Sequence, residues 1–411
     1  MMRTMTVGST ETKTPPRTKP LACSAVLTHH WLVRHRGGEK VLAALRELLP
    51  KSPVYTLVHD PAGYAKSLAG EAPSVPTGTP GDGIGNAPPF QGWGTESTPV
   101  RTSFLQRIPG AKKHYPKLLP LMPAAARAIR LPPVDLVVCS DAAIAKAMTP
   151  DPRSKLLCYC HSPMRYVWEP EIQEAYRRSL SPVLRPLFNL AARRIRVADY
   201  RAAQRVDQFV ANSQHVADRI RRHYGRDSVV IHPPVDLPAA PADGPREAFY
   251  LCVGYHVPYK RLDLAVEACR ELGRELVIIG EGPDLRRIDA GRDRHVTVLG
   301  WQPEQSVRDH YRRARALIFP GEEDFGMVPV EAMAHGCPVI AYAVGGARET
   351  VVPGETGVWF GQQSTQGLIE AIRRFEETRF DPHVLHAHSR QFGKERFLRQ
   401  MREVSERVLE I

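Results

Sequence analysis

The chain has 411 residues, which is too long for one ordinary hydrophobic core, so we expect two domains. No run of about 18 apolar residues occurs, and the polar residues 1–20 lack the apolar segment of a signal peptide, so a transmembrane helix is excluded and a cytoplasmic protein expected. The formal net charge of +12 favours an anionic partner: nucleic acid, an acidic membrane surface or a phosphorylated substrate.

The first half, residues 21–233, contains short apolar runs that end in small or polar residues and give way to helical patterns. Near-continuous apolarity is typical of strands buried on both faces of a parallel sheet. The strands expected here are 135–139, 156–160, 208–211 and 229–232. Residues 1–20 are expected to form a disordered tail, and 70–99, rich in Gly, Pro, Ser and Thr, a flexible insertion.

A helical stretch at residues 177–205 carries eight arginines beside several leucines. Such a stretch either lies on an anionic bilayer at the inner face of the plasma membrane or presents a solvated basic face over a packed apolar one. The sequence leaves both interpretations open.

The second half, residues 234–388, is a regular alternation of strands and helices. A proline-rich connection at 232–246 precedes it, and an amphipathic helix at 389–411 follows it. The predicted fold class is therefore α/β, with two Rossmann-like domains built on parallel sheets. The expected strands are 249–253, 276–279, 296–299, 316–319 and 338–341, and the helices 262–272, one from 283, 304–315 and 329–335.

The seven cysteines are odd in number and lie mostly inside apolar runs, so we expect no disulfide framework. Cys158 and Cys160 have no second cysteine pair nearby, which favours core positions over a metal site.

The sharpest motif places Glu323 and Glu331 eight residues apart across a strand-to-helix turn. Pro329 fits the first turn of a helix, so the backbone amides before it can bind an anion. An open α/β sheet binds its ligands at this edge. The segment between the two acids contributes further candidate donor-binding residues: Asp324, Phe325, Gly326, Met327 and Val328.

This segment resembles the retaining GT-B glycosyltransferases of family 4, whose E-x7-E motif it matches. The resemblance reaches from Ala25 to the C-terminus and is nearest to bacterial mannosyltransferases of O-antigen and exopolysaccharide synthesis. It implies that the two domains face a central cleft, that Glu323 contacts the donor sugar, and that Glu331 holds the ribose hydroxyls. It also implies that the C-terminal helix crosses back to the first domain.

Lys260 and Arg261 end the segment that follows the first strand of the second domain. Fixed cations aimed at a diphosphate leaving group stabilise the transition state more than the ground state, and Lys260 is the candidate for this catalytic role. Many family members carry an arginine where this chain has Tyr255. Arg261 either compensates or is a solvated surface residue.

In the first domain, Gly37 and Gly38 open an amphipathic helix, where orphan amides can bind phosphate oxygens. The resemblance assigns this loop to the donor diphosphate and the acceptor. Just upstream, His30 replaces the aspartate of the His-Asp-Trp sequence common in relatives, so acceptor-side chemistry is expected to differ there.

His161 follows a buried strand and, by the resemblance, contacts the region of the donor sugar's primary hydroxyl as a catalytic residue. The turns at Gly280, Gly282 and Trp301 end strands of the second domain and enclose the nucleotide base in relatives. For any one of these three residues, a plain strand-to-helix turn is an equally good interpretation.

The resemblance implies transfer of a hexose, with mannose from GDP-mannose ahead of UDP sugars, with retained configuration and without a metal or cofactor. The expected acceptor is a glycan or a polyprenyl-diphosphate-linked glycan. A nucleotide-sugar epimerase of the same fold is the alternative. A nucleic-acid-binding protein is disfavoured because no RNA or DNA module occurs, and a dehydrogenase because no G-x-G-x-x-G follows the first strand of either domain.

Overall fold

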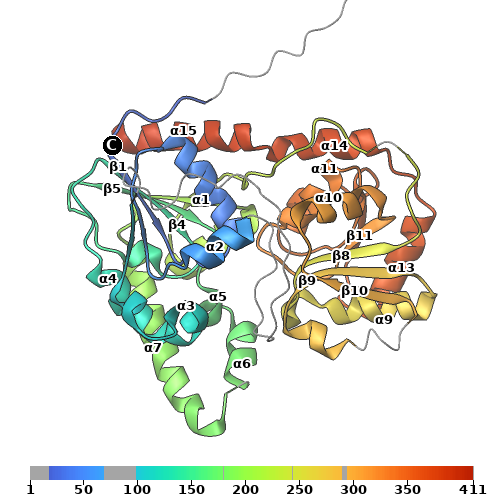
Figure 1. The fold of residues 1–411 in the computed structure, drawn as a ribbon, viewed down its shortest axis with the longest axis horizontal. Coiled ribbons are helices and arrows are strands. Elements are labelled where there is room, and N and C mark those ends of the chain that lie inside the picture. Colours follow the sequence, from blue (N-terminus) through green and yellow to red (C-terminus); the bar gives the residue numbers. More distant parts are fainter. Residues whose placement is uncertain (1–17, 69–98, 179, 243, 289–293, 411) are drawn as a thin grey trace, which may run out of the picture.

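The computed structural model describes residues 18–68, 99–178, 180–242, 244–288 and 294–410. These residues form two lobes, each built on a parallel sheet covered by helices (Figure 1). The predicted α/β class with two Rossmann-like domains is confirmed. The insertion expected at 70–99, apart from residue 99, and most of the tail expected at 1–20 lie outside the described residues.

The sheet of the first lobe has seven parallel strands. Their order is β3 (Val100–Thr102), β2 (Val54–Thr56), β1 (Ala25–His29), β4 (Leu136–Asp141), β5 (Lys155–Cys160), β6 (Gln208–Ala211) and β7 (Ser228–Val230). In β4, Leu136 and Val138 pack into one hydrophobic cluster while Val137 and Cys139 pack into another on the opposite face. Burial on both faces explains the near-continuous apolar runs.

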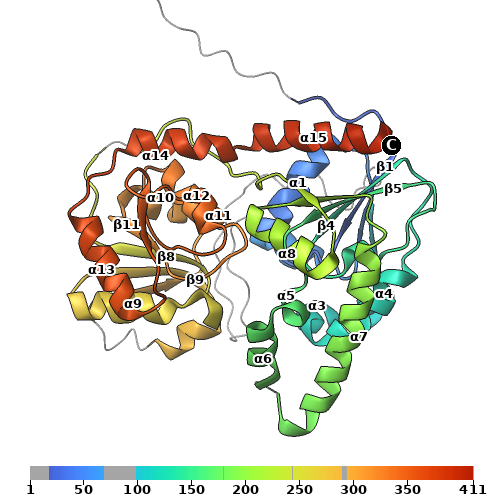
Figure 2. The same cartoon turned by 180° about the vertical axis from the view of Figure 1, so that it is seen from behind.

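The helices of the first lobe cover both faces of its sheet (Figures 1 and 2). They are α1 (Gly37–Leu48), α2 (Pro61–Leu68), α3 (Ala111–His114), α4 (Met122–Ala128), α5 (Arg165–Trp168), α6 (Pro170–Arg178), α7 (Arg185–Ala203) and α8 (Gln214–Tyr224). In α1, Val41, Leu42, Leu45 and Leu48 are buried on one face, as the periodicity predicts.

The sheet of the second lobe has six parallel strands, in the order β10 (Val296–Gly300), β9 (Leu276–Glu281), β8 (Tyr250–Tyr255), β11 (Ala316–Phe319), β12 (Val339–Tyr342) and β13 (Gly357–Phe360). Its helices are α9 (Leu262–Leu272), α10 (Glu304–Arg313), α11 (Met327–Ala334), α12 (Ala347–Thr350), α13 (Thr365–Glu376) and α14 (Pro382–Ser389).

The long C-terminal helix α15 (Lys394–Glu410) follows α14 of the second lobe and lies along the first lobe (Figures 1 and 2). Phe397, Met401, Val404 and Val408 recur at helical spacing and are buried against α1 and the first sheet. At its start, Val235 of the connecting segment bonds to Phe392 backbone to backbone. The chain therefore passes between the lobes twice at this side of the molecule.

Two helix predictions are corrected by the structure. Residues 177–205 form no continuous helix, because α6 ends at Arg178 and a 3-10 turn at Pro182–Leu184 precedes α7; a proline within a helix removes a backbone donor and clashes with the preceding turn. The helix expected from residue 283 is only a 3-10 turn, Pro283–Arg287. Strands β1, β2, β3 and β13 are additions to the expected set, and β2 and β3 are only three residues long.

Candidate active site

The carboxyl ends of the two sheets meet at one junction, where side chains of one lobe reach those of the other. Arg34 follows β1, and its Nη1 donates to Oε2 of Glu281, which ends β9, at 2.8 Å. Lys40 of α1 lies 3.1 Å from Glu331 of α11. Most of the sequence-predicted site residues follow strands that end at this junction.

Lys260 and Glu323 form an ion pair, with 2.7 Å between Nζ and Oε1, and each side chain is about one-fifth exposed. Burial is the largest influence and acts to lower the pKa of Lys260, but Glu323 and Tyr259 together hold that pKa above its ordinary value. A glycine permits this approach, because a Cβ on Gly321 would lie only 2.5 Å from Lys260 Cα. The pair is thus fixed within the second lobe.

Glu331 lies on α11 with both carboxylate oxygens occupied. Oε1 is 3.1 Å from Lys40 Nζ, and Oε2 accepts a hydrogen bond of 3.3 Å from the hydroxyl of the buried Tyr311. Each oxygen retains a second lone pair, so the carboxylate can still accept from a ligand that donates from two neighbouring hydroxyls.

The start of α11 faces the start of α1. Gly326 precedes α11 at φ 85°, a left-handed conformation that favours glycine, and a Cβ on Gly37 would lie 3.1 Å from Met327 Sδ. Two helix N-termini therefore converge, and their free amides and dipoles favour an anion between them. The side chain of Phe325 is buried against His232 and points into the core of the second lobe.

His161 belongs to a cluster of three histidines at the edge of the first sheet. Its Nε2 lies 2.8 Å from Ser140 Oγ, and the rings of His29 and His30 lie 6.5 and 6.4 Å away. Burial, with the neighbouring imidazoles, lowers the pKa of His161 to about 3 and that of His30 to about 3; burial lowers that of His29 to about 4. A Cβ on Gly38 would lie 3.7 Å from His161 Nε2, so the glycine loop and the cluster adjoin. The cluster is neutral at physiological pH.

Asp324 faces the first lobe, away from its neighbour Glu323. Its carboxylate contacts the buried Arg219 of α8, accepts from Ser162 Oγ at 3.3 Å, and lies 3.8 Å from Arg165. Arg219 also lies 3.1 Å from Glu322. Asp324 and Glu322 of the second lobe therefore join the two lobes through Arg219.

The remaining candidates lie around the end of β8. Arg261 adopts φ 52°, and its guanidinium pairs with Asp263 at 2.9 Å rather than with Glu323. Close packing of the backbone leaves no room for a side chain at Gly280 or Gly282. A Cβ on Gly280 would lie 1.8 Å from a carbonyl oxygen of β8, and one on Gly282 would lie 2.0 Å from the carbonyl oxygen of the residue after β8. Trp301 follows β10 and is half-buried.

Tyr255 and Tyr259 each have a cation of the first lobe over the ring. The guanidinium of Arg36 lies 4.7 Å from the centre of the Tyr255 ring, and that of Arg165 lies 4.5 Å from the Tyr259 ring. Such cation–π contacts are worth about 0.5–1 kcal/mol at exposed sites.

Sequence reasoning missed Lys40, Arg219 and Tyr311 as members of the site. Lys40 stands in the glycine motif, but nothing local indicates that it reaches Glu331. Arg219 is one of three arginines on α8 and is distinguished only by its burial.

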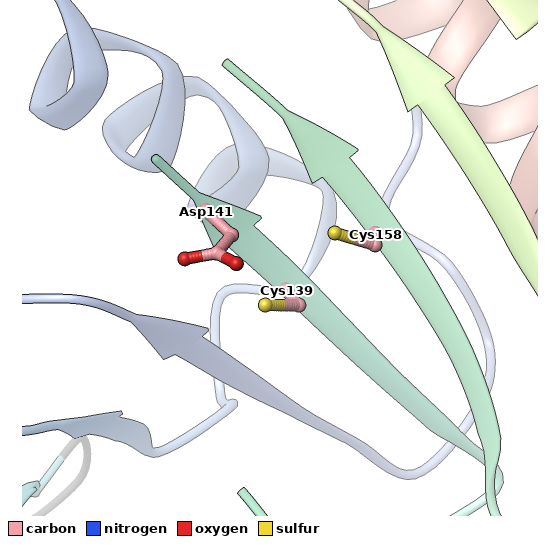
Figure 3. A group of neighbouring side chains, drawn as sticks. All are labelled: Cys139, Asp141 and Cys158. Atoms are coloured by element: carbon pink, nitrogen blue, oxygen red, sulfur yellow. The ribbon is translucent and has the colours of Figure 1, made fainter. Parts of the chain in front are cut away.

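Cys139, Asp141 and Cys158 form a cluster with metal-ligand atoms close together (Figure 3). Asp141 already binds Lys146 Nζ at 2.8 Å and two backbone amides, and burial raises the pKa of Cys158, so that thiol stays protonated. Metal ligation requires a thiolate. The cluster is part of the core.

Among the helices of the described residues, none combines the length and apolar character needed to cross a bilayer.

Two family models match adjoining parts of the chain. The model of glycosyltransferase family 4 matches residues 86–238, and that of the glycosyl transferases group 1 matches residues 238–395.

Curated relatives match over part of their length. An uncharacterized glycosyltransferase of Methanocaldococcus jannaschii is 29% identical over 171 residues, covering 40% of this chain and 48% of that protein. The D-inositol 3-phosphate glycosyltransferase of Rhodococcus opacus is 34% identical over 199 residues, covering 41% of this chain and 45% of that enzyme. The chain thus spans less than half the length of each.

Solved structures match over nearly the whole fold. HepE of Anabaena, in complex with UDP and glucose, has a TM-score of 0.63 at 16% identity and covers 93% of this chain and 99% of its own. The sucrose-phosphate synthase of Thermosynechococcus elongatus has a TM-score of 0.63 at 19% identity, with coverages of 93% and 98%. With these folds and the two family models covering residues 86–395, the chain belongs to the GT-B glycosyltransferases of family 4.

Proposed function

We propose that this protein transfers a hexose from a nucleoside diphosphate sugar to a glycan or lipid-linked acceptor. The observation that carries the proposal is the Lys260–Glu323 pair, 2.7 Å across, beside the start of α11. Lys260 is positioned to stabilise the charge that develops on the diphosphate as the glycosidic bond breaks. Glu323 contacts the sugar, and Glu331 receives the ribose hydroxyls.

The proposed reaction retains the anomeric configuration. The acceptor hydroxyl attacks the face from which the phosphate leaves, and the leaving phosphate takes its proton. His161, neutral and bonded to Ser140, donates to a hydroxyl of the donor sugar. No protein nucleophile is required, and neither a metal nor another cofactor is part of the proposal.

The donor is GDP-mannose or a UDP-hexose. Mannose follows from the resemblance of the motifs, whereas HepE of Anabaena was solved with UDP and glucose. A transfer assay with GDP-mannose, UDP-glucose and UDP-N-acetylglucosamine, each with and without a polyprenyl-diphosphate-linked glycan, tests the proposal. Acceptor-dependent transfer supports it; conversion of the donor in the absence of acceptor indicates an epimerase instead, and no reaction with any donor contradicts it.

A lipid-linked acceptor requires contact with a membrane, and α7 supplies a suitable surface at the cytoplasmic face. It projects from the first lobe (Figure 2) and exposes Leu187 at 63% and Val197 at 51%. A groove of about 770 Å³ lies between α7 and α4. Among the described residues it is lined by no acid but by five arginines, namely Arg127, Arg193, Arg194, Arg201 and Arg205.

Co-sedimentation with vesicles tests this surface. We expect binding to vesicles containing anionic phosphatidylglycerol, little binding to neutral phosphatidylcholine, and a loss of binding when Arg193 and Arg194 are both replaced by Gln. Equal binding to both lipids, or none to either, would contradict the membrane role.

A further inference from the structure

Lys40 is a residue of the first lobe whose side chain contacts the second lobe at the proposed donor site. It lies in the first turn of α1, and its ammonium is 3.1 Å from Glu331 and 3.9 Å from Glu304. The side chains of Lys40 and Glu331 are 23% and 22% exposed, so the pair is largely shielded from water. Glu331 is the strongest influence on Lys40 and holds its pKa above the ordinary value, so the ammonium stays charged.

This pair occupies the carboxylate that the ribose is proposed to use. Tyr311 already donates to Oε2 of Glu331, and Lys40 fills Oε1. Each oxygen retains a second lone pair, but the ammonium stands on the side of Oε1 that faces the first lobe, so a ribose hydroxyl that approaches Glu331 from the junction between the lobes meets Lys40 there. A ribose hydroxyl that took the place of Lys40 at Oε1 would separate the ammonium from Glu331.

The released ammonium has a second partner close by. Gly37 packs on Met327, which brings the first turns of α1 and α11 together, and the free amides at the start of α11 favour the donor's diphosphate there. Lys40 lies one helical turn along α1 from this contact, and its four-carbon stem is flexible. After losing Glu331 the ammonium keeps only Glu304, which is 3.9 Å away and 57% exposed, so a further anion beside it is favourable.

We propose that Lys40 is a donor-binding residue that neutralises Glu331 in the free enzyme and pairs with the donor's diphosphate when the ribose takes its place. The inference rests on the proposed function. It adds Lys40 of the first lobe to Lys260 as a cation that binds the diphosphate. It also means that nucleotide binding changes the contact between the two lobes.

The experiment compares a nucleoside diphosphate with its nucleoside in wild type and Lys40→Met. Dissociation constants for GDP and UDP are measured by calorimetry, and those for guanosine and uridine by ligand-observed NMR. In Lys40→Met we expect the diphosphate to bind about tenfold more weakly, since one charge-assisted contact is lost. The nucleoside is expected to bind more tightly, because nothing competes for Glu331.

Two variants act as controls. Lys40→Arg keeps the charge, and we expect the diphosphate affinity to stay within about threefold of wild type. Lys394→Met removes a lysine that pairs with Glu47 at 2.9 Å outside the site, and both affinities should be unchanged. Thermal unfolding of each variant verifies that it is folded.

Opposite changes for the two ligands support the proposal. Equal weakening of both, or no change in either, overturns it while leaving the glycosyltransferase proposal intact. Failure of the wild type to bind either GDP or UDP overturns both.

Discussion

The two lysine–glutamate pairs of the site have nearly the same distance and exposure but different architecture. Lys260 and Glu323 both belong to the second lobe, where Gly321 leaves room for the backbone of Lys260. Lys40 and Glu331 come from different lobes, and their contact depends on how the lobes dock. The difference indicates that the chemistry at the sugar is organised in advance within one lobe, whereas the ribose end of the site responds to the other.

Breaking the pair within the second lobe has the largest expected effect. Glu323→Gln and Lys260→Met should each lower the rate of sugar transfer by about 10³-fold, because fixed charge at the reacting bond is lost. The melting temperature should change by only a few degrees. A radiolabelled-sugar transfer assay measures the rate.

Glu247→Gln is the matched control, since Glu247 pairs with Arg313 at 2.6 Å away from the site, and it should transfer at the wild-type rate. Transfer by Glu323→Gln within a few-fold of wild type would remove the catalytic assignment.

Breaking the contact between the lobes should have a smaller effect. In Asp324→Asn the buried Arg219 loses one of its carboxylate partners, so we expect stability in urea to fall by about 2 kcal/mol. We expect kcat/KM to fall about tenfold, mainly through a higher KM for the donor, because the lobes dock less firmly.

Asp227→Asn, which alters an exposed pair with Arg221, tests whether these effects are specific and should leave both quantities unchanged. If Asp324→Asn left KM unchanged and lowered kcat alone, Asp324 would act on the donor directly, as its position in the sequence motif predicts.

The smallest expected effect concerns the histidine cluster of the first lobe. Folding holds the pKa of His29 near 4 and those of His30 and His161 near 3, below the usual 6.5. Their neutral forms therefore stabilise the fold fully above about pH 6.5, and this stability is lost as pH falls towards 4. The melting temperature, measured from pH 7.5 to 5, should decrease.

His30→Asn should make this decrease less steep, whereas His114→Asn, at an exposed position on α3, should leave the slope unchanged. An identical slope in wild type and His30→Asn would show that the ring of His30 is not held neutral by the fold.

The sequence predicts most of the second-lobe site and much less of the first. Glu323, Glu331 and Lys260 follow from a strand, a turn and a helix start, which are local patterns with a known place at a sheet edge. The partner of Glu331 could not be predicted, because it depends on packing between residues 291 positions apart.

Asp324 shows a further limit of local patterns. Neighbouring acids in a turn have the same spacing whichever way their side chains point, and only the position of Arg219 on α8 reveals that Asp324 faces the first lobe. The break before α7, by contrast, was available in the sequence as Pro182.

A crystal structure with bound GDP or UDP would show how the site holds its donor. We expect the ribose hydroxyls to bond to the carboxylate of Glu331, Lys40 to leave this carboxylate for the diphosphate, and Lys260 to remain beside Glu323. A nucleotide bound elsewhere, with Lys40 still about 3 Å from Glu331, would contradict this expectation.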